Sequence, residues 1–367
     1  MNDMRPAEAL EDAGPQAAIV FTGRWREFLP IALTNLLLII VTLGIYRFWA
    51  KARERRYLWS RTYVIDDHLD WTGTGREMFV GFLIVTAVVL PVLLTINVLL
   101  PALFLRGYWG WGIAVVLVLY GGIFYLYHVA RFRALRYQLS RSWWHGIRGG
   151  GAEGGWSYGF EAVWRYAAGA SAAGLLIPWA MAAMWNRRWR SMSFGPDGFA
   201  TSLDFSVLMW RWVLRYLVPF AGVFFIILFA AFGAGVGALA GEAGAQFGAV
   251  AAMILALVAV YLLYLVISIS YYALFYRTAA AALSLGGLRF EFDARTKDWL
   301  KLYLGNIAIV VFTLGLGLVF LSYRNWSFRV RHTGASGTVD LSLLTQSTTR
   351  SPAESEGLAD AFDFGSI

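Results

Sequence analysis

Long stretches of apolar residues, broken by short basic or turn-forming stretches, dominate the pattern of this chain. Four of them carry no charged side chain: Met78–Leu105, Gly110–Ala130, Tyr216–Gly241 and Phe247–Tyr276. A helix needs roughly 20 apolar residues to cross the hydrocarbon layer of a bilayer, and each stretch is that long. Backbone polar groups in lipid must be paired within the segment, so we expect each stretch to form a transmembrane helix.

Three further apolar segments are shorter, namely Leu29–Phe48, Tyr166–Trp185 and Leu302–Ser322. They could cross the bilayer, which would give seven crossings, or they could enter it and return to the same side. Gly44 favours a bend and thus a returning segment. Arg47 opposes this, because a guanidinium deep in a bilayer is costly. Both arrangements stay open at this point.

The chain also repeats itself. A single offset of 271 residues, without a gap, aligns Phe21 with Phe292, Arg24 with Arg295, Asn35 with Asn306 and Thr42-Leu-Gly44 with Thr313-Leu-Gly315. A more divergent middle copy carries Gly146-Ile-Arg148 and the basic–aromatic stretch that begins at Trp185. We therefore predict three internal repeats, which is typical of membrane proteins built by duplication.

Each repeat follows one plan. A strand-like piece comes first (Ala18–Thr22, Gly146–Arg148, Leu288–Phe292), and an apolar segment and a basic–aromatic stretch follow it. A hairpin-like piece with turn residues comes last (Thr62–Thr72, Met192–Thr201, Phe328–Leu341). The predicted fold class is a mainly α membrane protein: a polytopic helical bundle with three internal repeats and small cytoplasmic β-hairpins.

The corresponding division of the chain has seven parts. Disordered tails are predicted at both ends because these parts are polar and lack an apolar run. The parts are a tail 1–16, repeat unit 1 (17–77), transmembrane helix pair 1 (78–130), repeat unit 2 (131–212), transmembrane helix pair 2 (213–276), repeat unit 3 (277–345) and a tail 346–367.

Composition and charge agree with this division and add an orientation. Hydrophobic residues make up 59% of the chain and charged residues 15%, whereas soluble domains carry about 25% charged residues. Of the 31 lysines and arginines, only Arg106 lies in the two short turns between paired long helices. Short basic loops stay in the cytoplasm, so the repeat units are predicted to be cytoplasmic. This topology accounts for the basic charge, and no nucleic-acid partner is expected.

Motifs for chemistry are missing from the sequence. Cysteine is absent, the four histidines (His68, His128, His145 and His332) are scattered, and neither a phosphate-binding loop nor a nucleophile elbow occurs. We therefore predict no enzyme, no cofactor and no metal. An acid–base pair among His128, His145, Glu77 and Glu161 would reopen the question of an intramembrane enzyme.

The basic–aromatic stretches are the most distinctive polar feature. Trp and Tyr favour the headgroup zone, where arginine meets lipid phosphates. The expected partner is therefore the lipid bilayer, through anionic headgroups, although an ordinary interface belt would look the same; protein partners are not specified. The candidate headgroup contacts are Arg53, Arg55, Arg56, Tyr57, Arg187, Arg188, Trp189, Arg324 and Trp326.

Polar residues inside the apolar segments are few. Asn35 and Asn306, at matched positions, are candidate intramembrane polar contacts, either as interhelical hydrogen bonds or as a ligand site. A series of glycines (Gly233, Gly235, Gly237 and Gly241) is expected to allow close helix contact.

The first unit resembles the YjgN family of bacterial inner-membrane proteins, which carry a domain of unknown function. The residues that carry the resemblance are Phe21-Thr-Gly23, Asn35, Thr42-Leu-Gly-Ile-Tyr46, Phe48-Trp-Ala50, Arg56-Tyr57, Trp71-Thr-Gly-Thr-Gly75 and Gly146-Ile-Arg148. The chain departs from the family at Gly149–Gly151, where an aromatic residue is usual. The resemblance implies a multi-pass protein of the bacterial inner (cytoplasmic) membrane and carries over no catalytic residue.

Two functions are compatible with these features. The first is transport or lipid handling along a path between the duplicated helices. The alternative is a non-enzymatic membrane scaffold that binds anionic lipid or partner proteins through the cytoplasmic repeat units.

Overall fold

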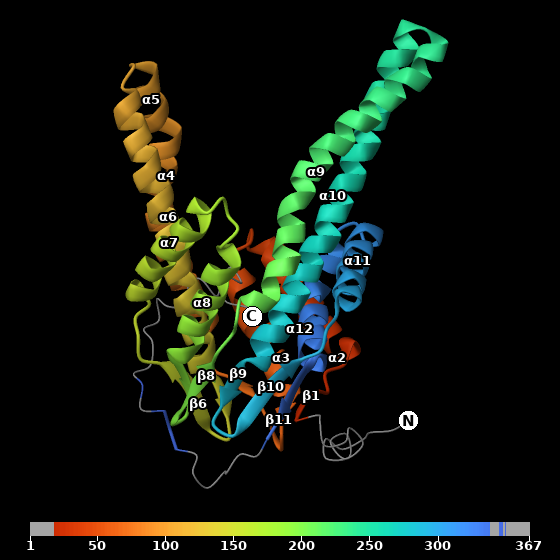
Figure 1. Cartoon of the computed structure of the whole chain (residues 1–367). Helices are drawn as coiled ribbons and strands as arrows, with labels where there is room; N and C mark the ends of the chain where they lie inside the picture. Colours follow the sequence, from red (N-terminus) through yellow and green to blue (C-terminus); the bar gives the residue numbers. More distant parts are fainter. Residues whose placement is uncertain (1–17, 338–344, 348, 350–367) are drawn as a thin grey trace.

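The computed structural model describes residues 18–337, 345–347 and 349. Two long helical pairs project from a base that is built of shorter helices and strands (Figure 1). The predicted first tail, 1–16, lies outside the described residues.

The four long apolar stretches form helices, as the sequence predicts. The first pair comprises α4 (Gly75–Leu94), which continues through a π-helical turn (Thr95–Leu99) into α5 (Leu100–Leu105), and α6 (Trp109–Arg141). The second pair comprises α9 (Ser206–Gly237), which ends in a 3-10 turn (Ala238–Ala240), and α10 (Glu242–Ala281). All four have the length and composition of a membrane span. The chain is therefore a membrane protein.

The long helices extend past the predicted limits of the transmembrane pairs. α6 continues from residue 130 to Arg141 and α10 continues from residue 276 to Ala281. Apolar length reports only the part of a helix that lipid can cover. The additional turns carry arginine and polar residues and lie in the base.

Each of the three shorter apolar segments doubles back on itself. The helices of these short hairpins are α2 (Trp25–Val41) with α3 (Arg47–Ser60), α7 (Trp156–Ser171) with α8 (Ile177–Arg190), and α11 (Thr296–Phe312) with α12 (Leu321–Arg331), the last joined through a 3-10 turn (Leu316–Phe320). Only the four long helices, among the described residues, are long and apolar enough to span. The seven-crossing arrangement does not fit this geometry.

A Thr-Leu-Gly sequence builds the turn of the first short hairpin. Leu43 and Gly44 both have positive φ, and the Gly44 amide donates to the Ile39 carbonyl at 2.8 Å, as in a Schellman motif. The Thr42 hydroxyl donates to the Leu38 carbonyl and accepts from the Tyr46 amide. The same three residue types thus end one helix and start the next.

The third short hairpin turns in the same way. Leu314 and Gly315 have positive φ, and the Gly315 amide donates to the Val310 carbonyl at 2.8 Å. The Thr313 hydroxyl accepts from the Gly317 amide. In the second short hairpin, Ala173 and Gly174 hold the two positive φ angles.

The strands form two antiparallel sheets at the base. A three-stranded sheet has the order β1 (Ile19–Phe21), β2 (Thr62–Val64), β3 (Asp67–His68). The other sheet is shaped like half a barrel and has the order β11-β10-β9-β8-β7-β6-β5-β4. Its strands are β4 (Asp70–Trp71), β5 (Ser142–Trp144), β6 (Ile147–Gly151), β7 (Met192–Phe194), β8 (Asp197–Thr201), β9 (Leu283–Leu285), β10 (Leu288–Phe292) and β11 (Thr333–Ser336).

The half-barrel is larger than the small β-hairpins that the sequence predicts. Eight strands from distant parts of the chain are joined, because β5 pairs with β4, β7 with β6 and β9 with β8. The predicted hairpin Phe328–Leu341 is wrong in its first part, since α12 continues to Arg331. Its last residues, 338–341, lie outside the described residues.

The second predicted tail, 346–367, is described only at Gln346, Ser347 and Thr349. These residues lie against β6 instead of being free. The Gln346 side chain donates to the Gly146 carbonyl and accepts from the Arg148 amide. A Cβ at Gly150 would meet the Thr349 hydroxyl, so the glycine at this position leaves room for the chain segment.

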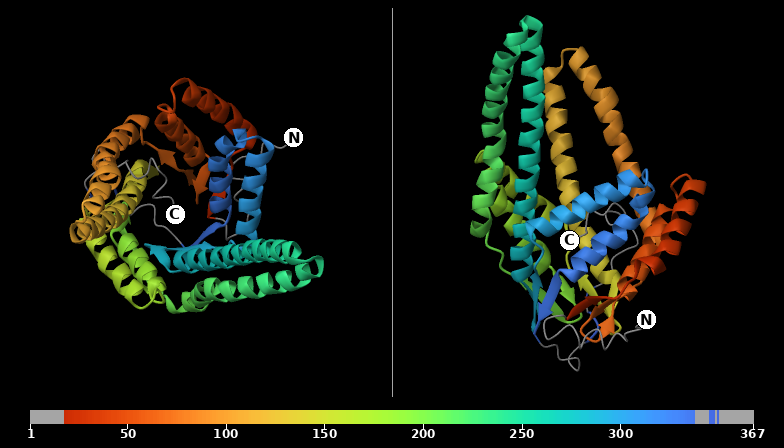
Figure 2. Two further views of the ribbon diagram at one scale, coloured as in Figure 1. Left: turned by 90° about the horizontal axis from the view of Figure 1, so that it is seen from above. Right: turned by 90° about the vertical axis from the view of Figure 1, so that its right-hand side faces the viewer.

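Aromatic contacts join the end of the chain to its beginning. Trp59 on α3 and Trp326 on α12 stack with ring centroids 4.1 Å apart. The Trp326 indole donates to the Thr62 hydroxyl, and the Tyr323 hydroxyl donates to the Gly23 carbonyl at 2.8 Å. The helices and strands of the base therefore surround a common centre, as the view from above shows (Figure 2, left).

Glycines permit close contact between α9 and α10. A Cβ on Gly233 would meet the Gly248 carbonyl oxygen, and a Cβ on Gly237 would meet the Gly244 carbonyl oxygen. Gly235 instead faces open space, and Gly241 occupies the turn with a φ of +87°. The predicted glycine contact thus holds for two of its four residues.

We expect Gly233→Ala and Gly237→Ala to destabilise the protein by about 1–3 kcal/mol each, because the added methyl overpacks the interface between the helices. Gly235→Ala is the matched control, since alanine favours a helix and has free space there. Thermal unfolding of the detergent-solubilised protein should show lower transitions for the first two variants only. A Gly233→Ala variant as stable as Gly235→Ala would contradict this packing.

Candidate functional site: a central cavity in the base

A cavity of about 800 Å³ occupies the centre of the base. The second helix of each short hairpin contributes to its wall: α3, α8 and α12. α6 and α10 close it from the side, and side chains of the strands lie below. This volume is typical of sites for small molecules and cofactors.

Ten aromatic side chains line the cavity. They come from the three short hairpins, from α10 and from the eight-stranded sheet. The aromatic lining residues are Trp59, Trp185, Trp189, Trp299, Trp326, Tyr276, Phe194, Phe199, Phe290 and Phe292. The indole N–H groups of Trp185, Trp189 and Trp299 are buried without a hydrogen-bond partner among the described residues.

Cationic side chains lie on one sector of this wall. Arg47, Lys51 and Arg55 come from α3, and Arg329 comes from α12. Glu54 is the one acidic lining residue in the described part of the chain. The cavity therefore combines aromatic walls with an excess of positive charge.

Helical spacing places the charged residues of α3 together. Arg47, Lys51, Glu54 and Leu58 recur every three or four residues and so share one face of the helix. Arg55 is buried beside them, and its guanidinium lies over the Trp71 ring at 4.9 Å. An aromatic face partly offsets the cost of burying a cation.

The predicted headgroup contacts divide into separate groups. Three of them, Arg55, Trp189 and Trp326, line the cavity. Arg53 and Arg56 are exposed on the other side of α3.

Two more of the predicted contacts, Tyr57 and Arg324, form hydrogen bonds within the base. Tyr57 donates to the Arg24 carbonyl at 3.0 Å, and burial raises the pKa of the Tyr57 phenol to about 12. Arg324 donates to the Asn306 side chain at 2.9 Å.

Two adjacent arginines on α8 have opposite environments. Arg187 forms a bidentate ion pair with Glu153, at 2.8 and 2.7 Å, and contacts Glu161 at 3.2 Å. Arg188 is buried and has no ion pair among the described residues.

The paired asparagines hold their own hairpins together. The Asn35 amide donates to the Ala50 carbonyl at 3.3 Å and so links α2 to α3. The Asn306 amide donates to Asn325 at 2.9 Å and links α11 to α12. Neither residue lines the cavity, so the geometry matches the interhelical alternative.

Several lining residues were missed by sequence reasoning. Arg47, Lys51, Glu54 and Arg329 were not among the predicted contacts, although the helical spacing on α3 was a usable signal. The candidates for acid–base chemistry lie apart. Glu77 binds Tyr137 and Arg141, Glu161 binds Arg165 and Arg187, and His145 contacts Asp66. The described part of the chain has no group of three or more His, Asp and Glu side chains that could hold a metal ion.

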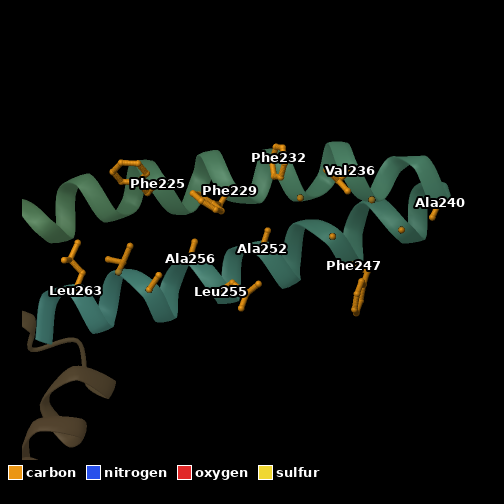
Figure 3. Close-up of a pocket in the computed structure, with 16 residues that line it drawn as sticks. Phe225, Phe229, Phe232, Val236, Ala240, Phe247, Ala252, Leu255, Ala256 and Leu263 are labelled. Atoms are coloured by element: carbon orange, nitrogen blue, oxygen red, sulfur yellow. The ribbon is translucent and has the colours of Figure 1, made fainter. Parts of the chain in front are cut away.

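A second cavity, of about 820 Å³, runs along α9 and α10. Its lining is apolar throughout, and Figure 3 shows phenylalanines such as Phe229 on α9 near small residues such as Ala252 on α10. Because both helices are candidate spans, this groove faces the region that lipid chains occupy. None of its described lining side chains is polar, so no side chain there could orient a ligand.

Four membrane-length helices and a base with short apolar hairpins define a multi-pass membrane protein. The family profile described as "Bacterial protein of unknown function (DUF898)" matches residues 16–361. The chain belongs to this family. The predicted resemblance to YjgN proteins is thereby confirmed.

Curated relatives are named inner membrane proteins. The chain is similar to "Inner membrane protein YjgN" of Salmonella typhimurium, with 28% identity over 134 residues, covering 35% of this chain and 33% of the relative. The protein of the same name in Escherichia coli K12 is 32% identical over 87 residues, 24% of this chain and 22% of the relative. The matched region is thus a third or less of either relative. No solved structure matches the chain.

The Glu153–Arg187 ion pair predicts a pH dependence. The Arg187 guanidinium lowers the pKa of the Glu153 carboxyl, so the pair stabilises the protein above the unfolded-state pKa, which is about 4.3. This contribution is lost as the pH falls through the lower, folded-state pKa. At pH 7 we expect Glu153→Gln to be less stable by about 1 kcal/mol or less, because the pair is partly exposed.

Chemical denaturation of both proteins between pH 3 and pH 7 would test this expectation. The stability difference should shrink as the pH falls toward 3. A difference that stays constant over this range would show that Glu153 acts without its charge.

Proposed function

We propose that this protein handles an anionic membrane lipid, which it binds in the central cavity. One observation carries the proposal: the cavity places Arg55 and Arg329 among tryptophan side chains. Guanidinium groups suit a phosphate, and aromatic walls suit the apolar part of the same molecule. An amphiphile with a negative headgroup matches both parts of the lining.

The tips of the short hairpins support a lipid as the ligand. Leu43 and Leu314 at the turns are each 94% exposed, and Val41 and Phe312 beside them are exposed as well. Lipid that covers apolar tips of this kind removes their surface from water and so stabilises them. The tips would then lie within the membrane, with the cavity directly below them.

We further propose that the base faces the cytoplasm and consists of three related units. Of the two turns that join the long helices, only the first holds a basic residue, Arg106. The base holds most of the others, as expected for the cytoplasmic side. The shared turn geometry at Leu43, Ala173 and Leu314 supports a common origin of the units.

Filling the cavity should reduce lipid binding. Ala280 lines the cavity on α10, and Ala281 beside it is exposed and does not line it. We expect Ala280→Phe to lower the amount of anionic lipid that co-purifies with the full-length protein several-fold, because the ring occupies the space. Ala281→Phe is the matched control. Native mass spectrometry of both variants in a zwitterionic detergent measures the retained phosphatidylglycerol.

Removing the positive charge should have a similar effect. Arg329→Gln should weaken phosphatidylglycerol binding about five-fold, since one basic group near a lipid phosphate contributes about 1 kcal/mol. Arg53→Gln, an exposed position on α3, should bind as the wild type does. Wild-type lipid retention in both Ala280→Phe and Arg329→Gln would overturn the proposal.

The orientation can be tested by cysteine labelling, since the chain has no native cysteine. Asp197→Cys and Ser336→Cys lie on exposed strand positions in the base, and Glu242→Cys lies at the far turn. A membrane-impermeant maleimide added to intact cells should label only Glu242→Cys. Labelling of the two base positions instead would reverse the assigned orientation.

A further inference from the structure

A second group of polar side chains lies between α6, α7 and α8. None of them lines the central cavity, although Arg188 contacts Trp185 in its wall. Arg188 on α8 is 5% exposed and His128 on α6 is 4% exposed. The His128 ring lies 5.1 Å from the Tyr166 ring and 6.3 Å from the Tyr158 ring, both on α7. Arg131, one turn after His128, adds a second guanidinium close enough to act on Arg188. We call these five residues the Arg188 cluster.

No carboxylate among the described residues compensates this charge. Arg188 has no hydrogen bond or ion pair within the described part of the chain, and its Nε is buried without a partner. Its guanidinium lies over the Trp185 ring at 5.5 Å, a contact that supplies no negative charge. Glu161, the acid that acts on Tyr158 of the cluster, is already paired with Arg165 at 2.7 Å and with Arg187 at 3.2 Å.

The other polar groups of the cluster are also unsatisfied or neutral. The Nδ1 atom of His128 is buried without a partner in the described residues. Burial raises the pKa of the Tyr158 and Tyr166 phenols, so both stay protonated and can donate hydrogen bonds. Burial lowers the pKa of Arg188, and Arg131 lowers it further, yet an arginine remains charged at neutral pH.

A buried, unpaired cation is expensive, because it loses its hydration and gains no counterion. Such a group persists where something else provides the negative charge. From this arrangement we infer that the Arg188 cluster is an anion site that takes a phosphate group. Two guanidiniums and two phenol donors match the charge and the acceptor oxygens of a phosphate.

The position of the cluster indicates where the phosphate comes from. The uncharged stretch of α6 ends at Ala130, directly before Arg131. The end of an apolar stretch marks the level of the lipid headgroups. Tyr127, 39% exposed, and the half-buried Arg131 lie at the outer side of the cluster. A lipid headgroup or a free phosphate ion could both supply the anion, and the inference does not depend on the central cavity.

Anion-dependent stability tests this inference. The thermal unfolding of the purified full-length protein is measured in neutral detergent with inorganic phosphate, against sodium chloride of equal ionic strength. A parallel measurement uses phosphatidylcholine nanodiscs with and without phosphatidylglycerol. An anion that binds the folded protein far above its Kd should raise the wild-type transition by roughly 5 °C.

Variants assign the response to the cluster. Arg188→Met should lose the rise and, without an anion, be at least as stable as the wild type, because an unpaired buried charge has been removed. Arg188→Lys should keep part of the rise. Arg133→Met is the charge-matched control on α6, since Arg133 donates to the Gly154 carbonyl and lies over Trp156, away from the cluster. With inorganic phosphate, Ala280→Phe should keep the full rise, which separates this site from the central cavity.

The arms distinguish the two sources. A rise with inorganic phosphate identifies a free-anion site, and a rise only with phosphatidylglycerol identifies a headgroup site. No rise in either arm would overturn the inference. An equal rise in wild type and Arg188→Met would do the same, even if both proteins fold normally.

Discussion

Backbone hydrogen bonds between neighbouring strands determine how this chain lies in the membrane. β1 pairs with β2, β6 with β7 and β10 with β11, and each pair flanks one short apolar segment. Paired strands lie about 5 Å apart, whereas a straight helix of 20 residues separates its ends by about 30 Å. The flanks of a segment that crossed the membrane could therefore not pair. The segment must turn back, and the two residues with positive φ make this turn possible.

The returning helices also create the cavity. Because α3, α8 and α12 each lead from a hairpin tip back to a strand, all three approach the same centre above the sheets. Their tips are apolar and their ends near the strands are basic and aromatic. The strand pairing thus determines two features: how far the hairpins reach from the sheets, and which side chains line the cavity.

The sequence predicted those features that depend on local pattern. Apolar length identified the four long helices, and the basic–aromatic stretches contained Arg55, Trp189 and Trp326 of the cavity. Pairings between distant residues could not be read in this way. Strand β8 pairs with β9, more than eighty residues further along the chain, and nothing local to Phe199 indicates Leu285 as its partner. Ion-pair partners also cannot be read from the local pattern. Glu153, the partner of Arg187, lies far before it in the chain.

Arg187 and Arg188 show why burial alone does not reveal a role. Consecutive residues on a helix point about 100° apart, so one guanidinium faces the loop that carries Glu153 and the other faces α6 and α7. Arg187 has its counterion, Glu153, within the chain, and this ion pair accounts for its position. The second has aromatic neighbours, another arginine and no acid in the described residues. Identical side chains at adjacent positions therefore differ in what they still require, and only the second requires a negative charge from outside the protein.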